Sequence, residues 1–174
     1  MNIWVQLFPA VIGLVGALIG AGAALYGQAL QRRHELTQRR QSLGFALAAE
    51  IEAYLDIIKQ RDWVLSAENL FKQASNGSLP KIEGWLSEQE KAKDPFPIFA
   101  ANMSNIGLLG QTTGPLAKFY TRVTGVRSTV TGLQDGIYDD LGPSGVANVI
   151  RAEIDLWLET VVLGRKIVND LRSL

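Results

Sequence analysis

The chain has 174 residues, with 17 Lys and Arg against 17 Asp and Glu, no Cys and one His. This neutrality argues against general nucleic-acid binding, which normally requires a basic face. Without Cys there are no disulfides, thiolate metal sites or Cys nucleophiles, and His34 alone offers little for His-based catalysis or transition-metal binding. We therefore expect no nucleic-acid partner, no metal and no cofactor.

An apolar stretch without charged residues, residues 7–27, organises the amino-terminal part of the sequence. As a helix it reaches about 30 Å, the thickness of a bilayer's hydrocarbon core. A lone crossing segment must be helical, because lipid offers no partners to backbone amides and carbonyls. We predict a short outside tail at residues 1–6, a transmembrane helix over residues 7–30 and a cytosolic region over residues 31–174.

The distribution of basic residues predicts the orientation. No Lys or Arg precedes the apolar stretch, and four arginines follow it closely. Basic residues stay on the cytoplasmic side, so we expect the amino terminus outside and the carboxy-terminal domain in the cytoplasm. The arginines either set this topology alone or also contact anionic lipid headgroups, at about 1 kcal/mol each. They are Arg32, Arg33, Arg39 and Arg40.

Two other interpretations of the apolar stretch compete with an anchor. A cleaved signal peptide would carry a basic segment first and a shorter apolar core of about 7–15 residues. Small residues at 21–24 nevertheless resemble a cleavage site. A buried helix of a soluble domain would normally show a polar face. The length and the missing basic segment favour the anchor.

Small residues recur along one stripe of the apolar stretch, at spacings of three and four. They let two helix backbones approach closely, and one GxxxG pair lies among them. Glycine is also common in membrane helices for other reasons, which is the alternative. The stripe predicts self-association through Gly13, Gly16, Gly20, Ala23 and Gly27.

The helical pattern continues beyond the anchor. We predict one long helix to about residue 74 with a flexible point at Gly44, a short helix over 81–93, and a loop over 94–114. The apolar stripe of the long helix comprises Leu43, Leu47, Ile51, Tyr54, Leu55, Ile58 and Leu65.

Two further helices are predicted, over residues 115–138 and 144–172. The first has apolar positions at Leu116, Phe119, Val123, Val126, Val130, Leu133 and Ile137. The second has Ala147, Ile150, Ile154, Trp157, Val161, Gly164, Val168 and Leu171 on one stripe. No segment alternates with period two, so the expected fold is all-α, a transmembrane helix continuing into an antiparallel helical bundle.

Little in the sequence predicts catalysis. Asp135, Asp139 and Asp140 are clustered as in hard-cation sites, but a solvated helix end explains them better. Phosphate-binding, hydrolase-nucleophile and zinc-protease motifs are missing. We therefore expect no enzyme, and a hydrolase or nuclease is the third interpretation only.

One segment carries a resemblance to known proteins. Residues 99–110, FAANMSNIGLLG, followed by LAKFY at 116–120, are similar to a stretch in uncharacterised bacterial single-pass membrane proteins. That resemblance implies an amino-terminal membrane helix, a helical cytosolic domain and a bacterial origin, and no activity. In layout the chain also resembles small membrane accessory proteins of RNA-guided antiviral systems, some of which assemble into pores.

These observations predict a non-enzymatic inner-membrane protein that self-associates and docks or scaffolds a partner protein through its cytosolic bundle. A partner patch is expected at Asn102, Asn105, Phe119 and Tyr120, unless these are loop caps and core aromatics. The alternative is a homo-oligomeric pore, which needs about five or more copies because one helix cannot enclose a channel.

Overall fold

The structure is a computed structural model that describes the backbone of residues 3–174 and the side chains from Gly20 onward. The chain divides into two compact units, Met1–Arg40 and Gln41–Leu174. Helix α1, Ile3–Gln60, contributes its first part to one unit and its last part to the other. Over the described residues every regular element is helical, so the predicted all-α class is confirmed.

The described part of the first unit is a helix whose described side chains lie on the surface. Residues 20–40 are all exposed. Contacts one turn apart join Gln31 to Glu35 at 3.3 Å and Gln38 to His34 at 3.1 Å. In the part of the chain with described side chains, no helix is apolar over a long enough run to cross a bilayer. Residues 7–19 of the predicted span lie outside that part.

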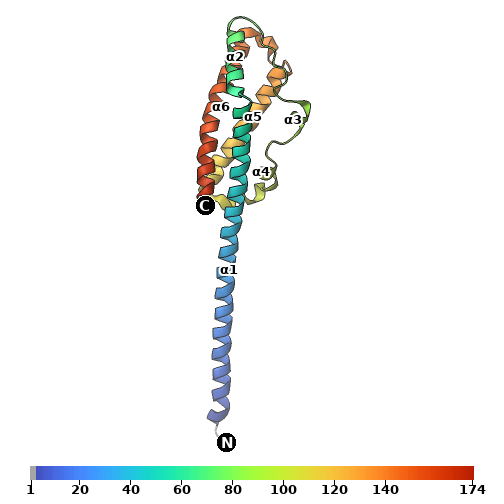
Figure 1. Cartoon of the computed structure of the whole chain (residues 1–174). Helices are drawn as coiled ribbons and strands as arrows, with labels where there is room; N and C mark the ends of the chain where they lie inside the picture. Colours follow the sequence, from blue (N-terminus) through green and yellow to red (C-terminus); the bar gives the residue numbers. More distant parts are fainter. Residues whose placement is uncertain (1–2) are drawn as a thin grey trace. The chain divides into compact units, whose positions relative to one another are not determined.

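The second unit contains the remaining elements, and Figure 1 labels its α-helices. Its long helices are the end of α1, α2, α5 and α6, and shorter helical segments lie between them. In chain order the elements after α1 are α2 (Trp63–Ser75), α3 (Glu88–Ala92), α4 (Pro97–Ala101), the 3₁₀ segment η1 (Met103–Thr112), α5 (Thr113–Gln134), the 3₁₀ segment η2 (Asp139–Leu141) and α6 (Gly142–Arg172).

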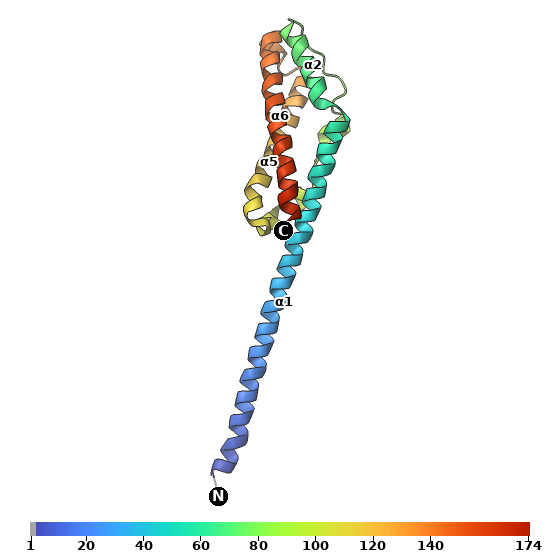
Figure 2. The same cartoon turned by 60° about the vertical axis from the view of Figure 1, so that its left-hand side comes forward.

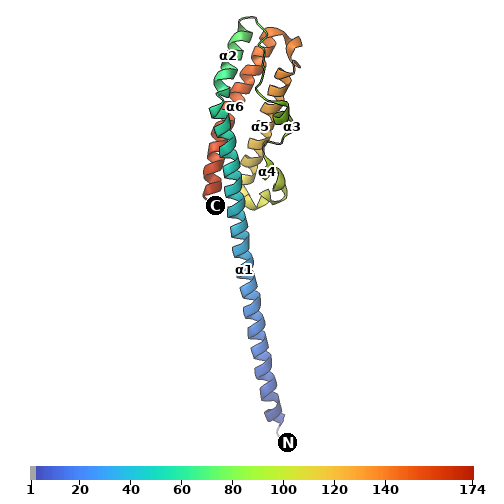
Figure 3. The same ribbon diagram turned by 45° about the vertical axis from the view of Figure 1, so that its right-hand side comes forward.

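Helix α6 runs antiparallel to the other long helices of this unit. Its last turn adjoins Gly44, since a Cβ added there would lie 3.0 Å from the Leu171 carbonyl oxygen. Further up α1, Leu55 meets α6 at Gly164. Figures 2 and 3 show α6 packed along α1 and α2, with its carboxyl end beside α1.

Helix α5 runs in the same direction as α1 and α2. Its early residue Tyr120 contacts Glu50 of α1, and its later residue Val130 lines a cavity with Trp63 of α2. The segment between α2 and α5 therefore returns along the bundle, and Figures 1 and 3 show α3 and α4 beside α5. An up-down-up order, the simplest arrangement for three helices, is not adopted.

The heptad stripes form the core, as predicted. Every predicted α6 position is buried except Val161, which is half-buried. On α5 the predicted positions from Leu116 to Val130 are buried, and Leu133 is half-buried. The largest fully buried side chains are Phe119, Leu47, Ile51, Leu86, Leu109, Leu116, Ile167 and Leu171.

The predicted uninterrupted helix to residue 74 is wrong. The chain breaks at Arg61 and Asp62, where Asp62 adopts the left-handed conformation (φ 47°, ψ 39°). Asp tolerates this conformation better than most residues, so neither Gly nor Pro is needed. Leu65 then falls on the exposed side of α2. Gly44, predicted as a flexible point, is instead a helical contact with α6.

The predicted segment boundaries between α2 and α6 also need correction. Only Glu88–Ala92 of the 81–93 helix is helical, because Gly84 has φ +74° and Ser87 caps the helix start. The predicted loop over 94–114 contains α4 and η1. Helix α5 ends at Gln134, before the turn in which Gly136 has φ +73°, and Ile137 is consequently exposed.

We predict that Gly164→Ala lowers the free energy of unfolding by about 1–2 kcal/mol, although alanine favours helix. The added Cβ would lie 2.7 Å from Phe119 Cε2 and 3.2 Å from Leu55 Cδ1. The matched control is Gly125→Ala on α5, where a Cβ meets nothing within 4 Å, and a gain of up to about 1 kcal/mol is expected. Urea unfolding of the full chain in one detergent measures both, and equal effects would contradict this packing.

Candidate functional site

A buried carboxylate connects three elements of the bundle. Glu50 on α1 is 9% exposed. Its Oε1 accepts from the Ile98 amide at 2.6 Å, and its Oε2 accepts from the Phe99 amide at 3.1 Å and the Tyr120 hydroxyl at 2.9 Å. Amides at a helix start lack intrahelical acceptors and favour negative charge. Glu50 therefore caps α4 from a distant helix.

Two buried tyrosines, Tyr54 and Tyr120, pack against Phe96, the residue before α4. Burial, followed by the charge of Glu50, raises the pKa of Tyr120 far above its ordinary value. Burial raises the pKa of Tyr54 to about 12, against the opposing effect of Arg127. Both hydroxyls stay protonated near neutral pH. The Glu50 centre is thus an enclosed structural junction.

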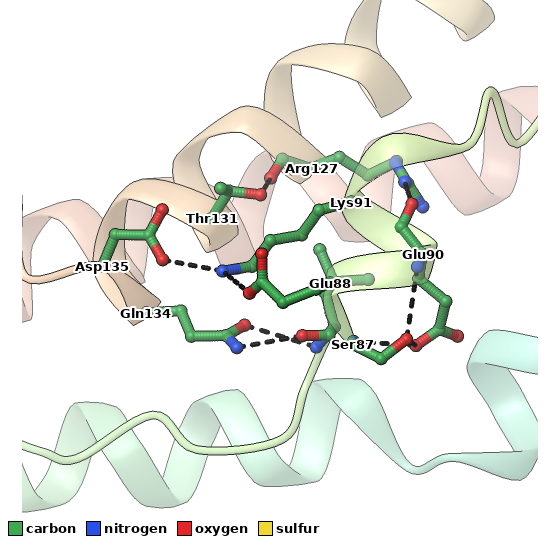
Figure 4. Close-up of polar contacts among 9 residues, drawn as sticks. Ser87, Glu88, Glu90, Lys91, Arg127, Thr131, Gln134 and Asp135 are labelled. Carbon is green, nitrogen blue, oxygen red and sulfur yellow. Dashed lines mark hydrogen bonds and ion pairs between the residues drawn. The ribbon is translucent and has the colours of Figure 1, made fainter.

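A second polar junction joins α3 to α5 (Figure 4). Lys91 Nζ lies 2.8 Å from Glu88 Oε1 and 2.7 Å from Asp135 Oδ1. Arg127 donates to the Glu90 carbonyl at 2.7 Å. The side-chain amide of Gln134 accepts from the Leu86 amide at 3.3 Å and donates to the Leu86 carbonyl at 2.9 Å. These contacts fix the returning segment on α5.

Helix α3 begins with a capping box. The Ser87 hydroxyl accepts from the Glu90 amide at 3.2 Å, and the Ser87 amide donates to the Glu90 carboxylate at 2.9 Å. Arg61 adds an ion pair to Glu90 at 2.7 Å. The Ser87 amide, then Arg61 and the Ser87 hydroxyl, lower the pKa of Glu90 to about 2. The kink between α1 and α2 is thereby tied to α3.

The predicted partner patch is not a surface patch. Phe119 and Tyr120 are 0% and 3% exposed and pack in the core. Asn102 donates to the Ile98 carbonyl at 2.8 Å and so closes α4. Asn105 alone is exposed. Phe119 and Tyr120 are therefore core aromatics and Asn102 is a helix cap, the alternative considered for them in the sequence.

The predicted membrane-facing residues belong to the first unit. Gly13 and Gly16 lie outside the residues with described side chains. Gly20, Ala23 and Gly27 are exposed, and a Cβ added at Gly20 or Gly27 would meet nothing within 4 Å. The arginines Arg32, Arg33, Arg39 and Arg40 are exposed as well.

The described side chains contain no group of three or more His, Cys, Asp or Glu residues placed to hold a metal ion. Of the acidic cluster considered in the sequence, Asp135 is an ion-pair partner of Lys91. Asp139 and Asp140 are exposed and both lie in η2.

An open groove of about 740 Å³ lies between the end of α1, the start of α2 and α6. Its apolar part includes Leu65 and Leu158, which are 56% and 48% exposed. Carboxylates outnumber cations around it. The charged residues that line the groove are Glu52, Asp56, Asp62, Glu68, Lys59 and Arg165.

A smaller cavity of about 50 Å³ lies between α2, α5, α6 and the segment before α3. Three tryptophans line it, together with aliphatic residues and one carboxylate, Glu153. Trp63, Trp85 and Trp157 come from three different elements. Their separation in sequence explains why sequence reasoning missed this site, and the unusual tryptophan content was the only available signal.

In comparisons with known proteins, no protein-family model, no curated protein and no solved structure matches the chain.

We predict that Glu50→Gln lowers the free energy of unfolding by about 2–3 kcal/mol, because an amide offers one acceptor atom where two are used. Asp56→Asn, an exposed change on the same helix, should alter stability by less than about 0.5 kcal/mol. Urea unfolding measures both variants. A Glu50→Gln protein as stable as the parent would show that the carboxylate does not hold α4 in place.

Proposed function

We propose that this chain is a non-enzymatic, self-associating protein of the bacterial inner membrane whose helical bundle docks a partner protein. Residues 7–30 would form the anchor, and the bundle over Gln41–Leu174 would carry the docking surface. The observation that carries the proposal is the groove beside α6, an open and partly apolar surface of the bundle.

The anchor rests on the sequence and on the exposure of the first unit. Residues 7–27 contain no charge, and an arginine cluster follows them. Residues 20–40 bury no side chain within the chain itself. Leu25, Tyr26 and Leu30 are consequently exposed apolar side chains, a feature that lipid or a second copy would cover.

The docking surface fits an amphipathic helix. Leu65 on α2 and Leu158 on α6 face solvent around the groove, and Leu55 and Val161 are half-buried along it. Helix-binding grooves combine such an apolar strip with charged borders. Since four carboxylates and two cations line this groove, we propose a partner helix that carries an apolar stripe flanked by basic residues.

The glycine stripe supports self-association. Small residues permit close backbone approach between membrane helices. A Cβ added at Gly20 would meet nothing within 4 Å, so a steric effect of enlarging this residue would come from another copy or from lipid.

We predict that the full chain sediments with membranes, resists alkaline extraction and is oligomeric in nanodiscs, and that Gly20→Leu shifts its mass toward one copy. Gly22→Leu is the matched control, because Gly22 is equally open but lies off the stripe. Native mass measurement reads out the copy number. A soluble or strictly monomeric chain would refute the anchor interface, and about five or more copies with ion leakage would favour a pore instead of a scaffold.

The docking surface is tested by a photo-crosslinking residue at Leu158, with Ile137 as the control position. Ile137 is 69% exposed and apolar but does not line the groove. We expect a discrete adduct from Leu158 alone. The partner protein captured in the adduct is then purified. The Leu65→Asp chain should bind this partner at least about tenfold more weakly than the parent chain, and the Ile137→Asp chain should bind it as well as the parent does. Equal adducts or equal affinities would contradict docking in the groove.

A further inference from the structure

One segment of the bundle presents a surface without charge. Residues 95–117 contain no Asp, Glu, Lys or Arg, although 20% of the whole chain is charged. Burial explains only part of this run, because many of its side chains are exposed. Water-exposed surfaces normally carry charges at about 25–35% of their positions. We call the exposed residues of this run the uncharged face, and they include Ala101, Met103, Ser104, Asn105 and Gln111.

The uncharged face lies at the end of the second unit that carries its first residue, Gln41. Tyr120 of α5 contacts Glu50 of α1, and the two helices run in the same direction. The start of α5 and the η1 segment before it therefore lie on the Gln41 side of this contact. The carboxyl terminus is at the same end, since the Gln41 amide donates to the Leu174 carbonyl at 3.5 Å. Figures 1 and 3 show α4 and the segment that follows it at this end.

The chain connects this end to the proposed membrane anchor through a short segment. Residues 31–40 separate the predicted transmembrane helix from Gln41, and they are helical. At 1.5 Å per residue such a segment is about 15 Å long. The headgroup layer occupies part of that length, because it adds about 5–8 Å to each side of the hydrocarbon core. With residues 7–30 as the anchor, this end of the bundle is within reach of the lipid surface.

The opposite end of the bundle is acidic. Asp135 follows the last residue of α5, and Asp139 and Asp140 lie in η2. All three side chains are exposed. An anionic membrane surface attracts basic groups and repels carboxylates. The two ends therefore differ as expected for a bundle that turns its uncharged face toward lipid and its acidic end away from it.

The uncharged face combines apolar and neutral polar side chains. Met103 is 59% exposed, and Ile106 of the same segment is half-buried. Phe45, on α1 at the same end, is 56% exposed. Ser104 and Asn105 can form hydrogen bonds with headgroups without the large desolvation cost of a charge. Interfacial protein surfaces have this composition, with apolar side chains at the boundary between headgroups and acyl chains.

We propose that the uncharged face contacts the lipid surface, with Met103 at the boundary between headgroups and acyl chains. This inference rests on the proposed membrane anchor and adds the side on which the bundle meets the bilayer. The docking groove is formed further along the bundle, by the end of α1, the start of α2 and α6. Contact through η1 therefore leaves the groove accessible to a partner protein.

The test uses a single fluorescent label on the full chain in nanodiscs of phosphatidylethanolamine and phosphatidylglycerol. The chain contains no Cys, so Met103→Cys and Ile137→Cys each provide one labelling position. Ile137 is the matched control, because it is 69% exposed and apolar but follows α5 at the acidic end. Lipids with a nitroxide on the headgroup quench labels at the membrane surface. We expect them to remove most of the fluorescence at position 103 and little at position 137.

Charged variants distinguish contact from mere proximity. Ser104→Glu combined with Asn105→Glu should reduce the quenching at position 103 to the control level, because carboxylates are repelled by anionic headgroups and costly to desolvate. Asn76→Glu combined with Ser78→Glu is the matched control, since these exposed residues follow α2 at the other end of the bundle. It should leave the quenching unchanged. Melting temperatures close to that of the parent show that the variants fold.

The anchor and the lipid contact fail in different ways. A chain that separates from the nanodiscs refutes the anchor and the contact together. A chain that stays in the nanodiscs but is quenched equally at the two positions, or unaffected by the Glu pair at 104 and 105, refutes the contact alone. Quenching should also persist in about 1 M salt, because the face has no charge to screen. Loss of quenching in salt would assign the contact to the arginines, and energy transfer between labels at position 103 without lipid quenching would assign the face to a second copy. Either result would overturn the proposal.

Discussion

The arrangement of the bundle depends on the bond between a buried charge and the start of a short helix. Glu50 is one of the few ionisable side chains inside the core, and it accepts three hydrogen bonds from two other elements. A buried carboxylate is tolerated only when such donors replace water. Phe96, the residue before α4, then packs between Tyr54 and Tyr120, with ring centroids 4.8 and 4.6 Å away. Charge and aromatic packing together determine where the returning segment ends.

The place where the returning segment ends explains why α5 runs parallel to α1. The chain leaves α2 at the far end of the bundle. The simplest fold would therefore have the next long helix run back, antiparallel to α1 and α2. Instead, Gln134 holds the Leu86 backbone, Lys91 pairs with Asp135, and Glu50 caps α4 at the opposite end. The segment between α2 and α5 is thus attached along its length, and α5 starts again beside the middle of α1. Helix α6 completes the bundle as the antiparallel member.

The sequence predicted the parts of this fold that depend on periodicity. The α6 stripe, the first five positions on α5 and the α1 positions from Leu43 to Ile58 are in the core, because burial at helical spacing leaves a repeated pattern. The break at Asp62 leaves no such pattern, since a single left-handed residue without Gly or Pro resembles any polar helix position. Phe119 belonged to the predicted apolar stripe as well as to the predicted patch, and the stripe proved right; Tyr120 lies off the stripe and is buried where its hydroxyl bonds Glu50. The tryptophan-lined cavity was not predicted for a related reason, because residues 63, 85 and 157 meet only in three dimensions.

Both candidate sites originate at the break between α1 and α2. Where the helix ends at Gln60, α2 takes a new direction, and the surface between the two helices and α6 is left open as the groove. The same break makes Trp63 the first residue of α2, where one side chain borders both the groove and the cavity. This geometry requires Asp62 to adopt a left-handed backbone conformation, which is unfavourable by about 1 kcal/mol or more for most residues. Arg61 offsets part of that cost through Glu90 and the face of Trp63. A strained residue held by its neighbours between two unfilled surfaces is typical of a binding region and not of a linker.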